Sequence, residues 1–186
     1  MQKNKPILIA TSLIATILLG QIIVWTQATE KGEYPLVPLG LMQAEFVDID
    51  DTSFRLNEFK GKVVLVNILG LWCGPCRVQI PSLIDLQKKY GDRGFVVIGL
   101  DIGDGSGVPE SVREIKLFAG SFGIHYYLAR SAKESTNEFY RVTKQQVVPQ
   151  TILIDRQGRL RGIFIGGGPR VEESLNKTMD EVMNEK

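Results

Sequence analysis

The feature that most constrains the fold of this chain is a pair of cysteines, Cys73 and Cys76, which are the only two cysteines in its 186 residues. They stand three positions apart in Trp72-Cys73-Gly74-Pro75-Cys76, just after an apolar run. A C-x-x-C pair at a strand-to-helix junction can form a disulfide and open it again, but it encloses too little chain to stabilise a fold by loop closure. The pair therefore indicates redox chemistry at the point where a buried strand leads into a helix.

A metal site is the main alternative to a redox pair. Structural zinc takes four Cys or His ligands, and this chain offers two cysteines and one histidine, His125. The two thiolates would nevertheless suit copper(I), which prefers soft ligands. A copper(I) or haem chaperone therefore stays open as an alternative, although we expect no metal and no cofactor besides a redox-active disulfide between Cys73 and Cys76.

Length and charge predict one domain with an N-terminal appendage. About 150 residues is an ordinary domain size, and the net charge of +1 favours neither an acidic nor a basic partner. The sequence contains no lysine or arginine stripe with interleaved aromatic residues, so we expect no nucleic-acid binding. We assign residues 1–28 to a cytoplasmic stub and a transmembrane anchor, residues 29–40 to a tether, and residues 41–186 to the domain.

The predicted anchor is the segment from Ile7 to Trp25, 19 residues without a charge that follow Lys3 and Lys5. A helix of this length, at about 1.5 Å per residue, nearly spans the ~30 Å hydrocarbon core of a bilayer. A cleavable signal peptide has a shorter apolar region, although residues 26–28 loosely resemble a cleavage site. Because lysines precede the span, the positive-inside rule places the domain in the periplasm or another extracytoplasmic space.

The rest of the chain alternates predicted strands and helices. The apolar runs Val63–Leu69 and Phe95–Asp101 predict buried parallel strands, joined by a helix over residues 73–90. Periodicity and turn residues predict short strands at 44–48 and 53–56, helices at 111–121 and 171–183, and a hairpin of strands at 151–155 and 160–165. The predicted class is α/β, with a mixed central sheet flanked by helices.

Several motifs together resemble one known family. They are Val63-Val64-Leu65-Val66-Asn67, the run Trp72-Cys73-Gly74-Pro75-Cys76-Arg77 with Pro81, and Val148-Pro149-Gln150-Thr151 followed by Ile152-Leu153-Ile154-Asp155. Over roughly residues 38–183 the chain is similar to the membrane-anchored, thioredoxin-like TlpA/ResA/CcmG group of thiol-disulfide oxidoreductases, the redoxins. The resemblance implies a thioredoxin-like fold, thiol-disulfide exchange outside the cytoplasm and, as in several members, reduction of the haem-binding cysteines of apocytochrome c. It also implies two partners, a disulfide-containing protein substrate and a membrane thiol reductase that supplies electrons.

The residues of the motif suggest individual roles. Cys73 is the expected nucleophile, because free N–H groups and the dipole at a helix N-terminus favour the thiolate. Cys76, one turn into the helix, is the expected resolving thiol that breaks the mixed disulfide. Gly74 leaves room for a substrate chain, and Pro75 is tolerated in a first helical turn because its missing N–H would be unpaired there. Trp72 is expected to line a groove beside the thiol, although it could equally serve packing alone.

The resemblance further implies that the Val148–Pro149 bond is cis and packs opposite Cys73. X-Pro bonds adopt cis at low cost, and a proline cannot donate to a strand ladder. The backbone of Val148 would then pair with an extended substrate. A trans proline that merely begins a strand is the alternative.

Two positions depart from the related proteins. Asn67 stands where thioredoxins carry a buried aspartate, and Gln79 stands where ResA-like members carry a glutamate. An amide is no general base at neutral pH, so deprotonation of Cys76 must rely on water or on another carboxylate. We expect any proton relay to involve the position of Gln79, with Asp101 or Glu45 as a stand-in acid, and a solvated strand-end acid is the alternative for both.

The sequence thus predicts an extracytoplasmic thiol-disulfide oxidoreductase. The Gly-Pro dipeptide between the cysteines is that of thioredoxin, a reductant, and this favours reduction of protein disulfides. Two alternatives stay open: a general antioxidant disulfide reductase, and a copper(I) or haem chaperone of cytochrome assembly.

Overall fold

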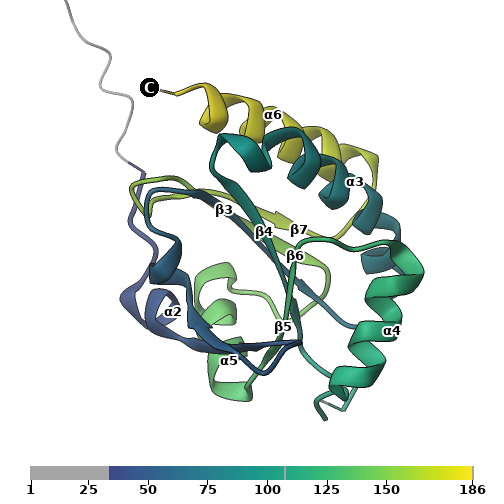
Figure 1. The fold of residues 1–186 in the computed structure, drawn as a ribbon. Coiled ribbons are helices and arrows are strands. Elements are labelled where there is room, and N and C mark those ends of the chain that lie inside the picture. Colours follow the sequence, from purple (N-terminus) through teal and green to yellow (C-terminus); the bar gives the residue numbers. More distant parts are fainter. Residues whose placement is uncertain (1–33, 107, 186) are drawn as a thin grey trace, which may run out of the picture. The chain divides into compact units, whose positions relative to one another are not determined.

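Seven strands form one mixed sheet in the computed structural model, which describes residues 34–106 and 108–185 (Figure 1). The strands are β1 (Glu45–Asp48), β2 (Ser53–Arg55), β3 (Val63–Leu69), β4 (Phe95–Asp101), β5 (Tyr127–Ser131), β6 (Gln150–Ile154) and β7 (Leu160–Ile165). Their order across the sheet is β2-β1-β5-β4-β3-β6-β7. The predicted α/β class with a mixed sheet is confirmed.

The two central strands carry the long apolar runs. β3 pairs in parallel with β4 over the whole of both strands, from Val63 opposite Phe95 to Leu69 opposite Asp101. β4 also pairs in parallel with β5, whereas the other neighbouring strands are antiparallel. Every residue of β3 and β4 is buried, as expected for strands that are covered on both faces of a sheet.

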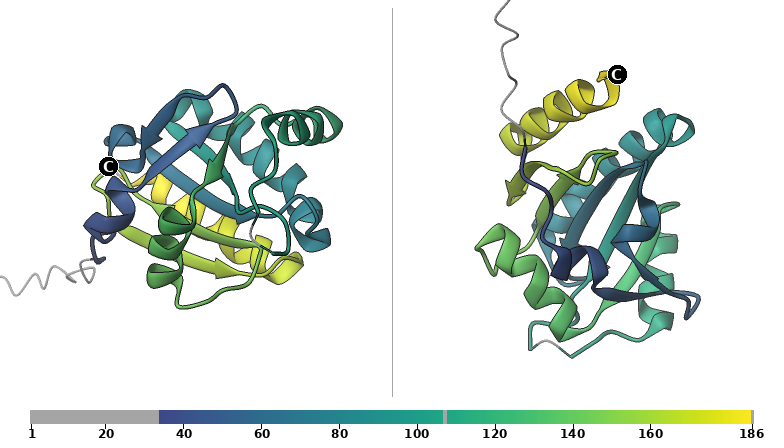
Figure 2. Two further views of the ribbon diagram at one scale, coloured as in Figure 1. Left: turned by 90° about the horizontal axis from the view of Figure 1, so that it is seen from below. Right: turned by 90° about the vertical axis from the view of Figure 1, so that its left-hand side faces the viewer.

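Helices cover both faces of the sheet (Figures 1 and 2). The helices are α2 (Leu39–Gln43), α3 (Gly74–Tyr90), α4 (Val112–Phe122), α5 (Lys133–Thr143) and α6 (Pro169–Asn184), with short 3-10 turns η1 (Leu56–Phe59) and η2 (Gly91–Arg93). Residues of α3, α4 and α6 share one apolar cluster, and residues of α2 and α5 share the other. Alternate residues of β3 enter the two clusters, so the sheet has a core on each side.

The described domain begins before the predicted boundary at residue 41. The N–H of Leu160 donates to the carbonyl of Pro35 at 2.8 Å, and the N–H of Val37 donates to the carbonyl of Gly158 at 2.9 Å. Val37 and Leu41 are both buried. Residues 34–40, which were predicted to lie in the tether, therefore belong to the domain, because backbone hydrogen bonds join them to it and Val37 enters one of its apolar clusters.

The predicted transmembrane anchor and the first part of the tether, residues 1–33, lie outside the described residues. Within residues 34–106 and 108–185, none of the helices has the length and apolar character needed to cross a bilayer.

Candidate active site

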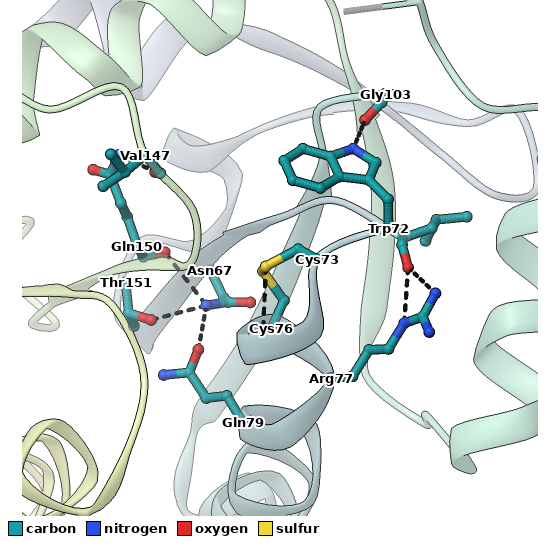
Figure 3. The surroundings of a disulfide bond; sticks show 11 residues. Asn67, Trp72, Cys73, Cys76, Arg77, Gln79, Gly103, Val147, Gln150 and Thr151 are labelled. Carbon is teal, nitrogen blue, oxygen red and sulfur yellow. Dashed lines mark hydrogen bonds between the residues drawn. A yellow bond between two sulfur atoms is a disulfide. The ribbon is translucent and has the colours of Figure 1, made fainter. Parts of the chain in front are cut away.

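The two cysteines lie where β3 leads into α3, and a disulfide joins them (Figure 3). Cys73 is the N-cap residue of α3, and the N–H of Cys76 donates to Cys73 Sγ at 3.1 Å. Both residues are buried, with 3 % of Cys73 and 2 % of Cys76 exposed. The sulfur of Cys73 thus sits at the positive end of a 17-residue helix, where a thiolate would be stabilised.

Trp72 is held beside this disulfide from two directions. Its indole Nε1 donates to the carbonyl of Gly103 at 2.9 Å, and half of the residue remains exposed. The ring also lies against Gly70, where a Cβ atom would stand 2.7 Å from the indole Nε1. On the other side of the loop, Arg77 Nε donates to the carbonyl of Leu71 at 2.9 Å. Two hydrogen bonds therefore hold the loop between β3 and α3. One comes from Arg77 of α3, and the other joins Trp72 to Gly103 in the segment after β4.

The loop before β6 brings Pro149 to the start of α3. The Val148–Pro149 peptide bond is cis. A Cβ atom on Gly167, which follows β7, would lie 3.4 Å from the carbonyl oxygen of Pro75 and 3.8 Å from Pro149 Cγ. Both prolines therefore lie close to one glycine, at which a Cβ atom would make ordinary van der Waals contact with them.

A group of buried neutral side chains lies on the β6 side of the disulfide, and we call Asn67, Gln79 and Thr151 the amide cluster (Figure 3). Asn67 Nδ2 donates to Gln79 Oε1 at 3.0 Å and to Thr151 Oγ1 at 2.9 Å, and it lies 3.3 Å from the carbonyl of Gln150. Gln79 Nε2 is buried without a hydrogen-bond partner among the described residues. The two departures from the related proteins thus meet in one hydrogen-bonded cluster that contains no titrating group.

Asp101 occupies a different environment on the β4 side. It is not a solvated strand-end acid, because only 2 % of the residue is exposed. The N–H of Gly103 donates to Asp101 Oδ2 at 3.1 Å, and the carboxyl of Glu110 lies against that of Asp101. Burial raises the pKa of Asp101 to about 8, and the neighbouring Glu110 adds to the increase. We call Asp101 and Glu110 the acid pair.

The structure does not bring Glu45 to the site. Glu45 begins β1, and β5 and β4 lie between that strand and β3. Its carboxylate pairs with Arg55 at 3.0 Å, and 54 % of its side chain is exposed. The prediction of Glu45 as a stand-in acid fails because sequence alone did not place β1 three strands away from the cysteines.

A groove of about 670 Å³ is lined by Trp72, the residue before Cys73, and by Val148, the residue before Pro149. Its walls also include Ile102 and Pro109 from the segment after β4, and Tyr140 from α5. A second pocket of about 510 Å³ lies between α3 and α6 and includes none of the residues that flank the cysteines. The first groove is therefore the one that can present a substrate to the disulfide.

Comparison with known proteins assigns the family. A model of the Redoxin family matches residues 41–179. This chain belongs to the Redoxin family. The redoxin is 26 % identical over 186 residues to the Thiol-disulfide oxidoreductase ResA of Geobacillus kaustophilus (strain HTA426), with 98 % of this chain and 99 % of that protein covered. It is 29 % identical over 125 residues to the Thioredoxin-like protein YneN of Bacillus subtilis (strain 168), covering 67 % of this chain and 69 % of that protein.

The fold of this redoxin is also similar to that of solved structures. A thiol:disulfide interchange protein of the thioredoxin family from Chlorobium tepidum TLS superposes with a TM-score of 0.64 at 24 % identity, covering 82 % of this chain and 98 % of that chain. The fold is therefore thioredoxin-like, as the motifs predicted. The redoxin is a thiol-disulfide oxidoreductase, and its Cys73–Cys76 pair has the matching chemistry.

Sequence reasoning gave no role in the site to Thr151, Gly70, Gly103 or Glu110. Gly70 and Gly103 each follow an apolar strand, and a glycine in such a position is a signal for close approach of another group. Glu110 gave no such signal, because it lies in an irregular segment nine positions after Asp101. Among the residues that the structure describes, no three His, Cys, Asp or Glu side chains form a group suited to a metal ion.

Proposed function

We propose that this redoxin reduces protein disulfides outside the cytoplasm while its N-terminal segment anchors it to a membrane, and that the haem-binding cysteines of apocytochrome c are its substrate. The observation that carries the proposal is the Cys73–Cys76 disulfide at the N-terminus of α3, beside a groove bounded by Trp72 and Val148. The charge-free segment from Ile7 to Trp25, with lysines before it, supports the anchor and the location.

The reaction begins with the reduced protein. The Cys73 thiolate attacks one sulfur of the substrate disulfide, which forms a mixed disulfide and releases the first substrate thiolate. Cys76 then attacks Cys73 Sγ, which closes the Cys73–Cys76 disulfide and releases the second substrate thiolate. Two electrons pass from the protein to the substrate. A membrane thiol reductase would return the protein to its dithiol form.

The roles of the two cysteines follow from their places in α3. Cys73 caps the helix, so its thiolate is stabilised by a hydrogen bond from the Cys76 N–H and by the positive end of the helix dipole. Cys76 lies one turn further in, where it can reach Cys73. No carboxylate belongs to the amide cluster, and we therefore propose that the Cys76 proton leaves to water.

The substrate chain would lie across the groove in an extended form. A Cβ atom built on Gly74 meets no heavy atom within 4 Å, so space is open beside the nucleophile. The backbone of Val148, just before the cis bond, could pair with the substrate as an added strand does. Such pairing needs few specific side chains and suits the unfolded C-x-x-C-H segment to which haem is attached in c-type cytochromes.

The test uses the full-length protein in detergent. Equilibration with thiol buffers should give the Cys73/Cys76 pair a reduction potential near that of thioredoxin, about −270 mV. A value near that of strong oxidants, about −120 mV, would reverse the proposed direction of electron flow.

Trapping tests the substrate. The Cys76→Ser variant should hold an oxidised C-x-x-C-H peptide as a mixed disulfide through Cys73, because no resolving thiol remains. Cys73→Ser is the matched control and should hold none. Release of the wild-type protein by carbonate extraction of membranes would contradict the anchor, and failure to trap the peptide would contradict the substrate.

A further inference from the structure

Two hydrogen bonds connect the Trp72 indole to the acid pair. Trp72 Nε1 donates to the carbonyl of Gly103 at 2.9 Å, and the N–H of the same glycine donates to Asp101 Oδ2 at 3.1 Å. Gly103 has a φ of +84°, and a Cβ atom there would stand 2.3 Å from the carbonyl oxygen of Val108. The close approach of Val108 therefore leaves the Gly103 backbone little room to move, and the Asp101 carboxyl binds its N–H.

The remaining oxygens of the acid pair require a proton. Asp101 Oδ1 and Glu110 Oε2 are buried, and neither accepts a hydrogen bond from an N–H or O–H of the described residues. The two carboxyls nevertheless lie against each other. Two ionised carboxylates in contact repel, whereas one proton shared between them turns a repulsive pair into a donor and an acceptor.

We propose that Asp101 and Glu110 are positioning residues that share one proton, and that this shared proton holds Gly103 where its carbonyl fixes the Trp72 indole beside Cys73. Trp72 forms a wall of the groove together with Ile102 and Pro109. Loss of the proton would separate the carboxylates, displace Gly103 and change how the indole bounds the groove. The consequence for substrate reduction rests on the proposed function, but the position of the indole can be measured without a substrate.

Most other ionisable groups at this end of the sheet have partners of their own. The exceptions are the Tyr126 hydroxyl and Arg130 Nε, which are buried without a hydrogen-bond partner among the described residues. Arg130, opposite Asp101 on β5, pairs with Asp51 at 2.6 Å. Lys116 of α4 pairs with Asp50 at 2.8 Å, and Glu114 of α4 accepts from Ser111. Asp104 accepts from the N–H groups of Ser106 and Val108, and burial raises the pKa of Tyr126 above its ordinary value. In the oxidised protein the cysteines do not titrate, so Asp101 is the group expected to titrate near pH 8.

The fluorescence of Trp72 tests the proposal directly. Full-length oxidised protein in detergent is titrated from pH 6 to pH 9.5 in a Trp25→Phe background, so that Trp72 is the only emitting tryptophan. The emission should change in one step near pH 8. Asp101→Asn and Glu110→Gln should each abolish the step and keep the emission of the low-pH form, because an amide donates an N–H that pH does not remove. Asp85→Asn, on the exposed face of α3, is the matched control and should keep the step.

Activity gives a second readout. Asp101→Ala removes the acceptor of the Gly103 N–H. It should raise the KM for an oxidised C-x-x-C-H peptide about tenfold, the effect of losing one ordinary hydrogen bond, and Asp101→Asn should restore the wild-type KM. If Asp101→Ala does not fold, the two amide variants still carry the test. A wild-type emission that does not respond to pH, or a step that persists in both amide variants, would overturn the proposal. An emission step without any peptide reduction would instead refute the proposed function and leave the shared proton standing.

Discussion

The disulfide lies between two groups of buried polar side chains, which find their hydrogen-bond partners in different ways. The amide cluster, on the β6 side, satisfies Asn67 with neutral acceptors from Gln79 and Thr151. The acid pair, on the β4 side, can be satisfied only while a proton remains between two carboxyls. The comparison shows that the environment beneath Cys76 does not respond to pH, whereas the environment that positions Trp72 does.

The largest effect should come from placing a charge in the amide cluster. Asn67→Asp replaces the donor Nδ2 with an oxygen that faces Gln79 Oε1 and Thr151 Oγ1. The new carboxylate faces oxygens unless the Thr151 hydroxyl or a turned Gln79 amide donates to it. Its burial should lower the free energy of unfolding by about 3 kcal/mol at pH 8, and less at pH 5, where the new acid is protonated. Urea denaturation at both pH values measures this, with Asn176→Asp on the exposed face of α6 as the control. Equal stability of Asn67→Asp at the two pH values would show that its carboxyl finds a donor.

Gln79→Glu should have a smaller effect on stability and a clearer one on chemistry. The new carboxylate still accepts from Asn67, so the cost at pH 8 should be about 2 kcal/mol. It also gives the amide cluster the titrating group that it lacks. The rate of exchange, followed from pH 5 to pH 9, should then gain a titration that the wild type does not have. An unchanged pH profile would argue against any proton-relay role at this position.

Asp101→Asn should make stability less dependent on pH. The pKa of Asp101 is raised in the folded protein from 3.8 to about 8. Between these values the unfolded chain binds fewer protons than the folded one, so the wild type loses stability as pH rises, by at most about 1.4 kcal/mol per pH unit. The variant should lose less over the same range in urea denaturation. Parallel curves for the variant and the wild type would mean that the folded protein ionises Asp101 normally.

The smallest effect should follow from Thr151→Val. It removes one acceptor of Asn67 Nδ2, but Gln79 Oε1 and the carbonyl of Gln150 remain within reach. The loss should be about 1 kcal/mol, with no change in the pH dependence of exchange. A loss as large as that of Asn67→Asp would mean that the hydroxyl organises the whole amide cluster.

Much of the fold could be predicted because apolar periodicity marks its central elements. Val63–Leu69 and Phe95–Asp101 are strands over the predicted residues, and the helix after Cys73 ends at Tyr90 as expected. α5 was missed because two of its three buried residues, Ser135 and Thr143, are polar, and only Phe139 adds to an apolar stripe. β5 was missed because its five residues include Arg130 and Ser131, which weaken the apolar pattern.

The features of the site that could be predicted are likewise those set by a local motif or by the family resemblance. The motif placed Cys73 at a helix start, and the family resemblance implied the cis bond before Pro149; both are present. The interactions of Asp101 could not be predicted, because its partner Glu110 comes from an irregular segment whose path no local pattern sets. Side chains that meet through tertiary packing, rather than through spacing along a helix or strand, leave no trace in the sequence.

The place where the chain enters the domain has a practical consequence. Pro35 and Val37 bond to the turn between β6 and β7, beside the start of β3, whereas the cysteines follow its end. The seven residues of β3 separate these two regions by about 20 Å. A sensor chip or an electrode coupled at Tyr34 itself would therefore hold the domain at one end of β3 and leave the redox pair at the other. Electrochemistry on such a surface would report on a disulfide that the attachment itself does not touch.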